Sequence, residues 1–334
     1  MIYFWQNRQE LSCSLNVLYK SMGTSKQNFH QRLRRSKRQQ EEIFLLVDLI
    51  KQIRQDHPTM NSRAMYYKIN PVFIGRDKFE MICRECGFNV ERRRNYRKTT
   101  DSTRVIRFDN LLQDREITAV DQVWSSDITY YEVEGIFYYL TFIIDNYSRR
   151  IVGHHASGRL QTEQTTLPAL TMAIKTRGNC IKEGLVFHSD GGGQYYDDNF
   201  LALTRKYKIA NSMCEAAWEN GKAERINGVI KNNYLIHWNI KTPGDLFKKV
   251  DRAVRLYNED KPHNRLGRLS PVQFVNKISK LVGEGQLGDK KPKNHKRQVM
   301  SKTSTQETVK NKSVTRESTL RSELHKSLKT VNVI

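Results

Sequence analysis

The sequence lacks any long apolar run. A helix that crosses a membrane needs about 20 consecutive, mostly apolar residues, and no stretch of the 334 residues approaches this. The apolar start, Met1 to Trp5, is followed at once by Gln, Asn and Arg, which is not the pattern of a secretory signal peptide. A membrane partner is therefore not expected.

Cysteine is scarce, and ATP-binding motifs are missing. Five cysteines, an odd number in a long chain, give no disulfide framework and favour a reduced intracellular compartment. Cys83 and Cys86 form a lone CxxC pair without histidines at matching spacing, so a structural zinc ion is not expected. No Gly-x-x-x-x-Gly-Lys-Ser/Thr motif occurs, which argues against ATP as a partner.

Acidic residues are few relative to basic ones. The chain has 57 Lys and Arg against 35 Asp and Glu, a net charge of +22. Such an excess favours polyanions, because each neutralised phosphate releases condensed counterions. Ribosomal and membrane-surface proteins share this bias, so the charge alone does not identify the partner.

Residues 1–50 are predicted to form a helix-turn-helix unit with a connecting helix. Over residues 12–37 two short helices are expected, separated at Gly23, and an amphipathic helix is expected over 41–56. The second short helix carries Arg32, Arg34 and Arg35, which could contact DNA as a recognition helix does. The alternative is an exposed basic helix without a ligand.

Residues 51–100 are predicted to form a second unit of this kind. Helices are expected on both sides of Asn70-Pro71, and a basic run that includes Arg92, Arg93 and Arg94 follows them. A charge run of this kind is often a solvated linker. Its position between two candidate DNA-handling units favours contact with phosphates.

Residues 115–280 have the pattern of a mixed-sheet α/β domain. Three β-rich runs, over 123–133, 137–144 and 150–155, are separated by short turns and predict an antiparallel meander. Helices and short strands then alternate up to a long helix over 216–234. Residues 281–334 lose this periodicity and are predicted to be a flexible basic tail.

Three carboxylates stand where chemistry could use them. Asp127 lies inside the first strand, Asp190 ends the fourth strand ahead of three glycines, and Glu224 lies in the long helix. Each alone has an ordinary structural explanation, such as a turn or a surface ion pair. Together, three hard oxygen ligands without a nearby His–Cys set suit Mg²⁺ or Mn²⁺. Asp145, at the end of the second strand, is expected to be structural.

A polar face is predicted around Glu224. Asn220, Asn227 and Lys231 are spaced so that they share one side of the helix with Glu224. The helix thus gathers its polar side chains on the same side as the Glu224 carboxylate.

Several ordered stretches resemble the DDE transposases with a retroviral-integrase core, in particular insertion-sequence family three. The resemblance covers about residues 120–275, and the unit at His57-Pro58 is similar to the helix-turn-helix segment of that family. The matching stretches are Trp124–Thr129, Ile144–Gly153, His188–Asp190 with Gln194-Tyr195, Ser212-Met213, Asn220 with Glu224 and Lys231, Tyr257-Asn258, Pro262-His263, and Leu266 with Ser270-Pro271.

The resemblance implies a fold, an activity and a set of partners. The fold would be RNase H-like, a mixed five-stranded sheet with flanking helices behind small all-helical modules. The chain would be the transposase of a bacterial insertion sequence, acting on DNA in the cytoplasm, at the nucleoid, as a homo-oligomer that holds two DNA ends. A water molecule and then a 3′-OH would attack phosphodiesters in line.

Site residues are also implied by the resemblance. Asp127, Asp190 and Glu224 would be catalytic and would bind two ions of Mg²⁺ or Mn²⁺. Lys231 would contact DNA near the scissile phosphate, and Asn220 and Gln194 would position the strand.

The interval between the last two carboxylates is shorter than is usual in that family. From Asp190 to Glu224 is 224 − 190 = 34 positions. Glu215 and Glu219 are therefore competitors, but Glu224 keeps the expected offsets to Asn220 and Lys231. A non-catalytic DNA-binding repressor or domesticated transposase remnant is the alternative function, and an RNase H-type nuclease or a retroviral integrase is the enzymatic rival.

Overall fold

The computed structural model describes residues 14–90, 107–113, 115–181, 183–214 and 220–283, with Asn7 and Gln9. All of them belong to the unit Met1–Gln286, and no residue of the second unit, Leu287–Ile334, is among them. Two predicted features, the basic run with Arg92, Arg93 and Arg94 and the tail beyond residue 283, thus lie outside the described residues.

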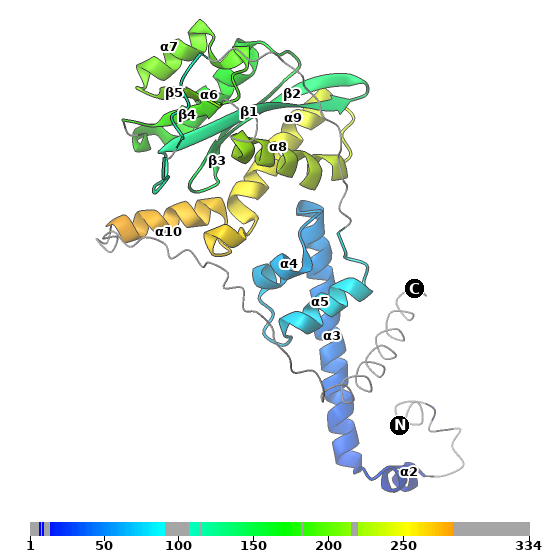
Figure 1. The fold of residues 1–334 in the computed structure, drawn as a ribbon. Coiled ribbons are helices and arrows are strands. Elements are labelled where there is room, and N and C mark those ends of the chain that lie inside the picture. Colours follow the sequence, from blue (N-terminus) through cyan, green and yellow to red (C-terminus); the bar gives the residue numbers. More distant parts are fainter. Residues whose placement is uncertain are drawn as a thin grey trace, which may run out of the picture. The chain divides into compact units, whose positions relative to one another are not determined.

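A five-stranded mixed sheet has the strand order β3-β2-β1-β4-β5 (Figure 1). β1 (Val123–Val133), β2 (Ile136–Asp145) and β3 (Ile151–Ser157) form the predicted antiparallel meander. Glu134 and Gly135 join β1 to β2 with positive φ values of 50° and 81°, the backbone of a tight hairpin turn. β4 (Val186–Ser189) and β5 (Ala210–Met213) continue the sheet in parallel on the other side of β1.

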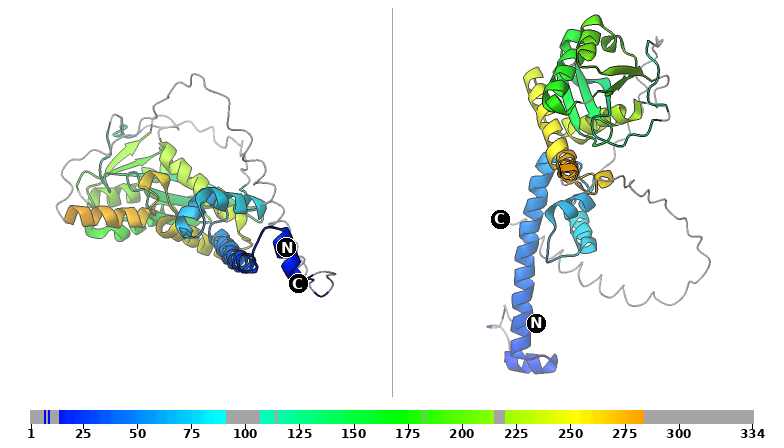
Figure 2. Two further views of the ribbon diagram at one scale, coloured as in Figure 1. Left: turned by 90° about the horizontal axis from the view of Figure 1, so that it is seen from below. Right: turned by 90° about the vertical axis from the view of Figure 1, so that its left-hand side faces the viewer.

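Helices cover both faces of this sheet (Figures 1 and 2). Phe142 points to the face that α8 (Gly221–Asn233) and α9 (Pro243–Arg255) cover, whereas its neighbour Ile143 points to the face of α6 (Thr166–Arg177) and α7 (Asp198–Lys206). On β3, Gly153 lets α6 approach closely, because a Cβ there would lie 2.2 Å from the carbonyl oxygen of Ala169. The arrangement is the RNase H-like α/β fold that the sequence predicts.

Within the described residues ahead of the sheet, the chain forms α2 (Leu15–Ser21), α3 (Lys26–Asp56), α4 (Ser62–Ile69) and α5 (Arg76–Glu85). The sequence predicts separate helices on the two sides of residue 38, but α3 runs through as one helix of 31 residues. No glycine or proline interrupts residues 36–40, and Arg38 pairs with Glu42 one turn later. α3, α4 and α5 share a small core that includes Ile50 and Phe79.

Beyond α9 the chain makes a π-helical turn over Leu256–Asp260 and ends its described part with α10 (Pro271–Gly283). The turn is fixed to β3, because Asn258 bonds both the amide (2.9 Å) and the carbonyl oxygen (2.8 Å) of Ile151. The long helix predicted over 216–234 begins at Gly221 in the described residues, which exclude 215–219. Among the residues that are described, none of the helices has the length and apolar character needed to span a membrane.

Candidate active site

Asp127 and Asp190 lie side by side because of the strand register. In the parallel pair β1–β4, Ser125 is opposite His188, and each carboxylate comes two residues later on its own chain segment. Asp190 therefore lies just beyond the carboxyl end of β4, where sites form in sheets with parallel strands, and Asp127 lies on the neighbouring strand β1, two residues past the stretch that pairs with β4.

The loop after β4 is shaped around Asp190. Gly191 has φ of 80°, and the amide of Gly192 donates a hydrogen bond to Asp190 Oδ1 at 3.2 Å. A Cβ on Gly192 would lie 3.2 Å from Gln194 Oε1 and 3.4 Å from Asp190 Oδ1, so a side chain would crowd both. Gln194 itself donates to the carbonyl oxygen of Leu160 at 3.1 Å.

The predicted polar face of α8 lies along β1. Asn220, just ahead of α8 and only 2% exposed, donates to the carbonyl oxygen of Ser126 at 2.8 Å. Asn227 donates to Asp127 Oδ2 at 2.8 Å. Lys231 Nζ donates to Thr129 Oγ1 at 2.9 Å and to the carbonyl oxygen of Tyr130 at 3.1 Å.

Glu224 belongs to the same face and is exposed in the first turn of α8. Its charge reaches Asp127: burial, and then the charges of Asp190 and Glu224, raise the pKa of Asp127 to about 7. The hydrogen bond from Asn227 acts in the opposite direction and stabilises the ionised carboxylate. The structure thus brings the three predicted carboxylates into one electrostatic group, from β1, the loop after β4, and α8.

The donor types in this group fit a hard divalent cation. The buried amide oxygens of Asn220 and Asn227 have no hydrogen-bond partner among the described residues, and positive charge would stabilise the half-buried Asp127 carboxylate, which the other two carboxylates repel. No set of three His, Cys, Asp or Glu side chains in the described ranges is already at ligand spacing. The charge of Glu224 acts on Asp127 although the two carboxylates are not at ligand spacing. Because the Glu224 side chain is exposed, a change of rotamer could bring its carboxylate closer to Asp127.

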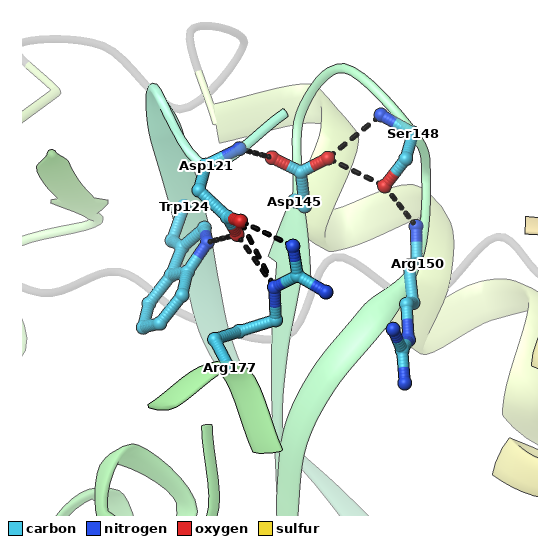
Figure 3. A network of polar contacts seen from close by, with 6 residues as sticks. All are labelled: Asp121, Trp124, Asp145, Ser148, Arg150 and Arg177. Atoms are coloured by element: carbon cyan, nitrogen blue, oxygen red, sulfur yellow. Dashed lines mark hydrogen bonds and ion pairs between the residues drawn. The ribbon is translucent and has the colours of Figure 1, made fainter. Parts of the chain in front are cut away.

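Two further acids nearby are used inside the protein (Figure 3). Asp145, fully buried, accepts bonds from the amides of Asp121 (2.9 Å) and Ser148 (2.7 Å) and from the Ser148 hydroxyl. Asp121 forms an ion pair with Arg177 and accepts from Trp124 Nε1 at 3.0 Å. Their oxygens are occupied by protein donors, as the expected structural role of Asp145 requires.

One contact in the site was not assigned from the sequence. The Tyr195 hydroxyl lies 2.9 Å from Ser126 Oγ and links β1 to the loop that carries Asp190. Tyr195 is 2% exposed, and burial raises the pKa of its hydroxyl well above the usual value, so it stays neutral. The Gln194-Tyr195 pair was the available signal, but a sequence does not show which strand a buried tyrosine contacts.

The predicted DNA-binding arginines of the N-terminal unit are on α3. Arg32, Arg34 and Arg35 are exposed, and within the described residues none of them forms an ion pair. They lie within one long helix rather than in a short recognition helix.

Comparisons with known proteins agree with the geometry of the sheet. A family model described as "Integrase core domain" matches residues 117–217, and a second model with the same description matches residues 205–271. The transposase for insertion sequence element IS629 of Shigella sonnei is 26% identical over 269 residues, which are 78% of this chain and 88% of that protein.

Two other relatives give similar matches. The insertion element IS600 31 kDa protein of Shigella sonnei is 29% identical, over 64% of this chain and 79% of that protein. Transposase InsF for insertion sequence IS3A of Escherichia coli (strain K12) is 31% identical, over 51% of this chain and 59% of that protein.

Among solved structures, the HTLV-2 integrase catalytic core domain in complex with magnesium aligns with a TM-score of 0.37 and 21% identity. That alignment covers 46% of this chain and 96% of the integrase chain. The simian T-cell lymphotropic virus intasome aligns with a TM-score of 0.41 and 15% identity, over 76% of this chain and 77% of that one.

Proposed function

We propose that this chain, which belongs to the insertion-sequence transposases with an integrase core domain, cuts and joins DNA strands at the ends of its own element. The observation that carries the proposal is that the charges of Asp190 and Glu224 both act on the half-buried Asp127, whose pKa they help to raise to about 7. A group of three carboxylates suits phosphodiester chemistry with divalent cations.

Asp127, Asp190 and Glu224 would hold the cations, two ions of Mg²⁺ or Mn²⁺. When bound, such ions increase the nucleophilicity of the attacking oxygen and stabilise the leaving oxygen of a phosphodiester. In the proposed reaction a water oxygen forms a new P–O bond while the P–O bond to the 3′ oxygen breaks, which frees a 3′-OH. That hydroxyl then attacks a second phosphodiester in line, loses its proton, and displaces another 3′ oxygen.

The chain's other residues have supporting roles. Asn227 holds Asp127 in its ionised form and fixed in position, and Asn220 ties the start of α8 to β1 as a positioning residue. Gln194 stiffens the loop that carries Asp190 through its bond to Leu160, which leaves its amide oxygen for the DNA strand.

Lys231 is suited to contact a phosphate. Its ammonium group has three donors, and two of them bond Thr129 and Tyr130. The third donor and the positive charge remain for an anion beside Asp127. Burial lowers the pKa of Lys231, and the charge of Asp127 acts in the opposite direction.

The helical units ahead of the core would recognise the ends of the element. Arg32, Arg34 and Arg35 would contact DNA from α3, and the basic run with Arg92, Arg93 and Arg94 is proposed from sequence alone to contact phosphates. Two ends must be held together for transposition, so a homo-oligomer is proposed, acting in the bacterial cytoplasm at the nucleoid.

The test is strand transfer with labelled element ends in Mg²⁺ or Mn²⁺. Asp127→Asn, Asp190→Asn and Glu224→Gln are each expected to abolish the product while DNA binding persists. Glu132→Gln, an exposed carboxylate on the same strand β1, is the matched control and should keep full activity. Unchanged activity in all three site variants would refute the assignment, and end binding without cleavage by the wild type would favour the repressor alternative.

A further inference from the structure

Five basic side chains from three separate segments form a group that the proposed site does not use. Arg149 follows β2, Lys222 and Arg225 lie on α8, and Lys261 and Arg265 lie between α9 and α10. Their charges act on one another: Arg149 is repelled by Arg265 and Arg225, Lys222 by Arg149 and Arg265, and Lys261 by Arg225. We call these five residues the basic cluster.

The fold holds these cations together despite their repulsion. Tyr147, in the turn before Arg149, contacts Phe274 of α10 with ring centroids 5.9 Å apart. Lys261 Nζ lies 5.8 Å from the ring centres of both Tyr234 and Tyr257, a cation–π arrangement. Ring packing thus helps to anchor the segments that carry the cluster, and ion pairs of Asp260 with Lys68 and His57 hold the segment next to Lys261.

No member of the basic cluster forms an ion pair within the ranges that the structure describes. The nearby carboxylate of Asp145 is fully occupied by Asp121 and Ser148. Burial, and then repulsion by the charge of Arg225, lower the pKa of Lys261 to about 8. A bound anion of several charges would relieve that repulsion.

A groove of about 680 Å³ continues from Arg225 along α8. One wall is formed by α8 and the turn that follows it, and the other by residues 59–62 and 88–90 of the helical unit ahead of the core. Amide, hydroxyl and arginine donors line it, among them Asn61, Ser62, Asn89, Arg225 and Asn232, and none of its lining residues is acidic. Such donors fit an anionic sugar–phosphate chain, because they can bond its phosphate oxygens and the hydroxyl and ether oxygens of its sugars.

Gly228 gives an independent sign that something outside the protein occupies this groove. A Cβ at this position would meet only Asn232 Nδ2, at an ordinary 3.8 Å, so no protein atom requires a glycine here. Glycine in the middle of a helix is unfavourable relative to alanine. Glycine is, however, the residue that lets another backbone approach a helix closely.

Two faces of α8 carry related patterns. Glu224, Asn227 and Lys231 lie toward β1, and the residues one position later, Arg225, Gly228 and Asn232, line the groove. A step of one residue turns the face by about 100°. One helix thus separates the carboxylates from a donor-lined surface that faces the helical unit.

We propose that the basic cluster and this groove form one continuous track that binds the sugar–phosphate backbone of a DNA strand. The track rests on the proposed function and deepens it: a DNA end held by the helical unit would reach the carboxylates along α8. Arg149, Lys222, Arg225, Lys261 and Arg265 would contact phosphates, and Gly228 would allow the backbone to lie against the helix.

The first test measures how DNA affinity depends on salt. The double variant Arg225→Gln/Arg265→Gln is compared with Lys248→Gln/Lys277→Gln, which removes two exposed lysines of α9 and α10 outside the track. Binding is measured with a random-sequence duplex and no divalent ion. For Arg225→Gln/Arg265→Gln, the slope of the logarithm of the association constant against the logarithm of the salt concentration should become shallower by about 0.9 for each phosphate that this variant no longer neutralises. The control should keep the wild-type slope, and equal slopes for the two double variants would overturn the track.

The second test fills the groove. Gly228→Phe is expected to weaken DNA binding strongly, and Gly228→Ala, which adds a single methyl group, should weaken it less. Thermal unfolding of both variants shows whether the phenylalanine is accommodated. A folded Gly228→Phe variant with wild-type affinity would exclude the groove as the path, and if that variant does not fold, the salt slope decides alone.

The track and the proposed chemistry fail in different ways. Asp127→Asn should lose strand transfer but keep the wild-type salt slope, and the track variants should change the slope. If the wild type shows no strand transfer but binds DNA in a salt-dependent way, and the track variants weaken this binding, the proposed function is refuted and the track is supported. Strand transfer with unchanged slopes in the track variants would refute only the track, and a wild type without salt-dependent DNA binding would refute both.

Discussion

Asn227 donates a hydrogen bond from Nδ2 to Oδ2 of Asp127 at 2.8 Å, and this bond joins α8 to the central strand of the sheet. Lys231 makes the next contact along the same two elements, to Thr129 and Tyr130. The helix that carries Glu224 is therefore held in register with the strand that carries Asp127.

Asn227→Ala is expected to slow strand transfer by about tenfold to a hundredfold. A hydrogen bond to a charged group contributes about 1.5–3 kcal/mol, and each 1.4 kcal/mol of barrier is about a factor of ten in rate. Because the missing bond stabilises the ionised form, the pKa of Asp127 should rise further above 7. Rates measured across pH should recover partly at high pH, and Asn239→Ala, at an exposed position, should match the wild type throughout.

Without divalent ions, the contribution of Asp127 to stability should fall as the pH rises from about 4 to about 7, whereas His263, whose pKa burial lowers to about 4, contributes in the opposite direction. The folded-state pKa of Asp127, about 7, lies above the ordinary value of 3.8, so in this interval this carboxyl binds more protons in the folded state than in the unfolded state. By linkage its contribution to the free energy of unfolding then falls with pH, by a few kcal/mol at most. Urea unfolding at several pH values, in a chelator, measures this fall.

Two additions make that measurement decisive. Asp127→Asn removes the titrating group and with it this contribution, so between about pH 4 and 7 the stability of the variant should fall less, or rise more, than that of the wild type. Added Mg²⁺ or Mn²⁺ should restore stability above pH 7 in the wild type and not in this variant, because a ligand that binds only the folded state stabilises it. The same pH dependence in the variant and in the wild type would contradict the raised pKa.

The sheet could be predicted from the sequence because its signals are local. Alternating apolar residues in β2 and the Glu134-Gly135 turn give the meander without knowledge of any distant contact. The side-chain spacing on α8 likewise predicts the shared face of Glu224 and Lys231. What that face contacts depends on packing across about a hundred residues of sequence, as in the bonds from Asn220 to Ser126 and from Lys231 to Thr129.

The basic cluster shows the opposite situation. Arg149, Lys222 and Arg265 are far apart in the sequence, and each alone looks like an ordinary surface charge. Only the packed structure shows that their charges act on one another, that Asp145 acts on Arg149 and Lys222 in the opposite direction, and that none of the three forms an ion pair among the described residues. The continuity of α3 was also hidden, since separate apolar and basic patterns along one helix resemble two helices.

Arg177→Met should destabilise the protein by about 3–5 kcal/mol. Arg177 and Asp121 form an ion pair whose side chains are only 10% and 5% exposed, so the substitution leaves a buried carboxylate without its partner (Figure 3). Arg38→Met breaks an ion pair whose arginine is 82% exposed and should cost less than about 1 kcal/mol. Urea unfolding of the two variants measures the difference, and equal losses of stability would show that burial does not decide the contribution of the pair.

Gly153→Ala and Gly228→Ala should change stability in opposite directions. A Cβ on Gly153 would lie 2.2 Å from the carbonyl oxygen of Ala169 and 2.8 Å from the Cβ of Ala173, and backbone of α6 cannot move away without disturbing the core. Overpacking of this kind costs about 1–3 kcal/mol or more. At Gly228 the added methyl meets nothing closer than 3.8 Å, so alanine should stabilise α8 by up to about 1 kcal/mol. The urea concentrations at the midpoints of unfolding show whether each variant is more or less stable than the wild type. A stabilised Gly153→Ala variant would contradict the close approach of α6 to β3.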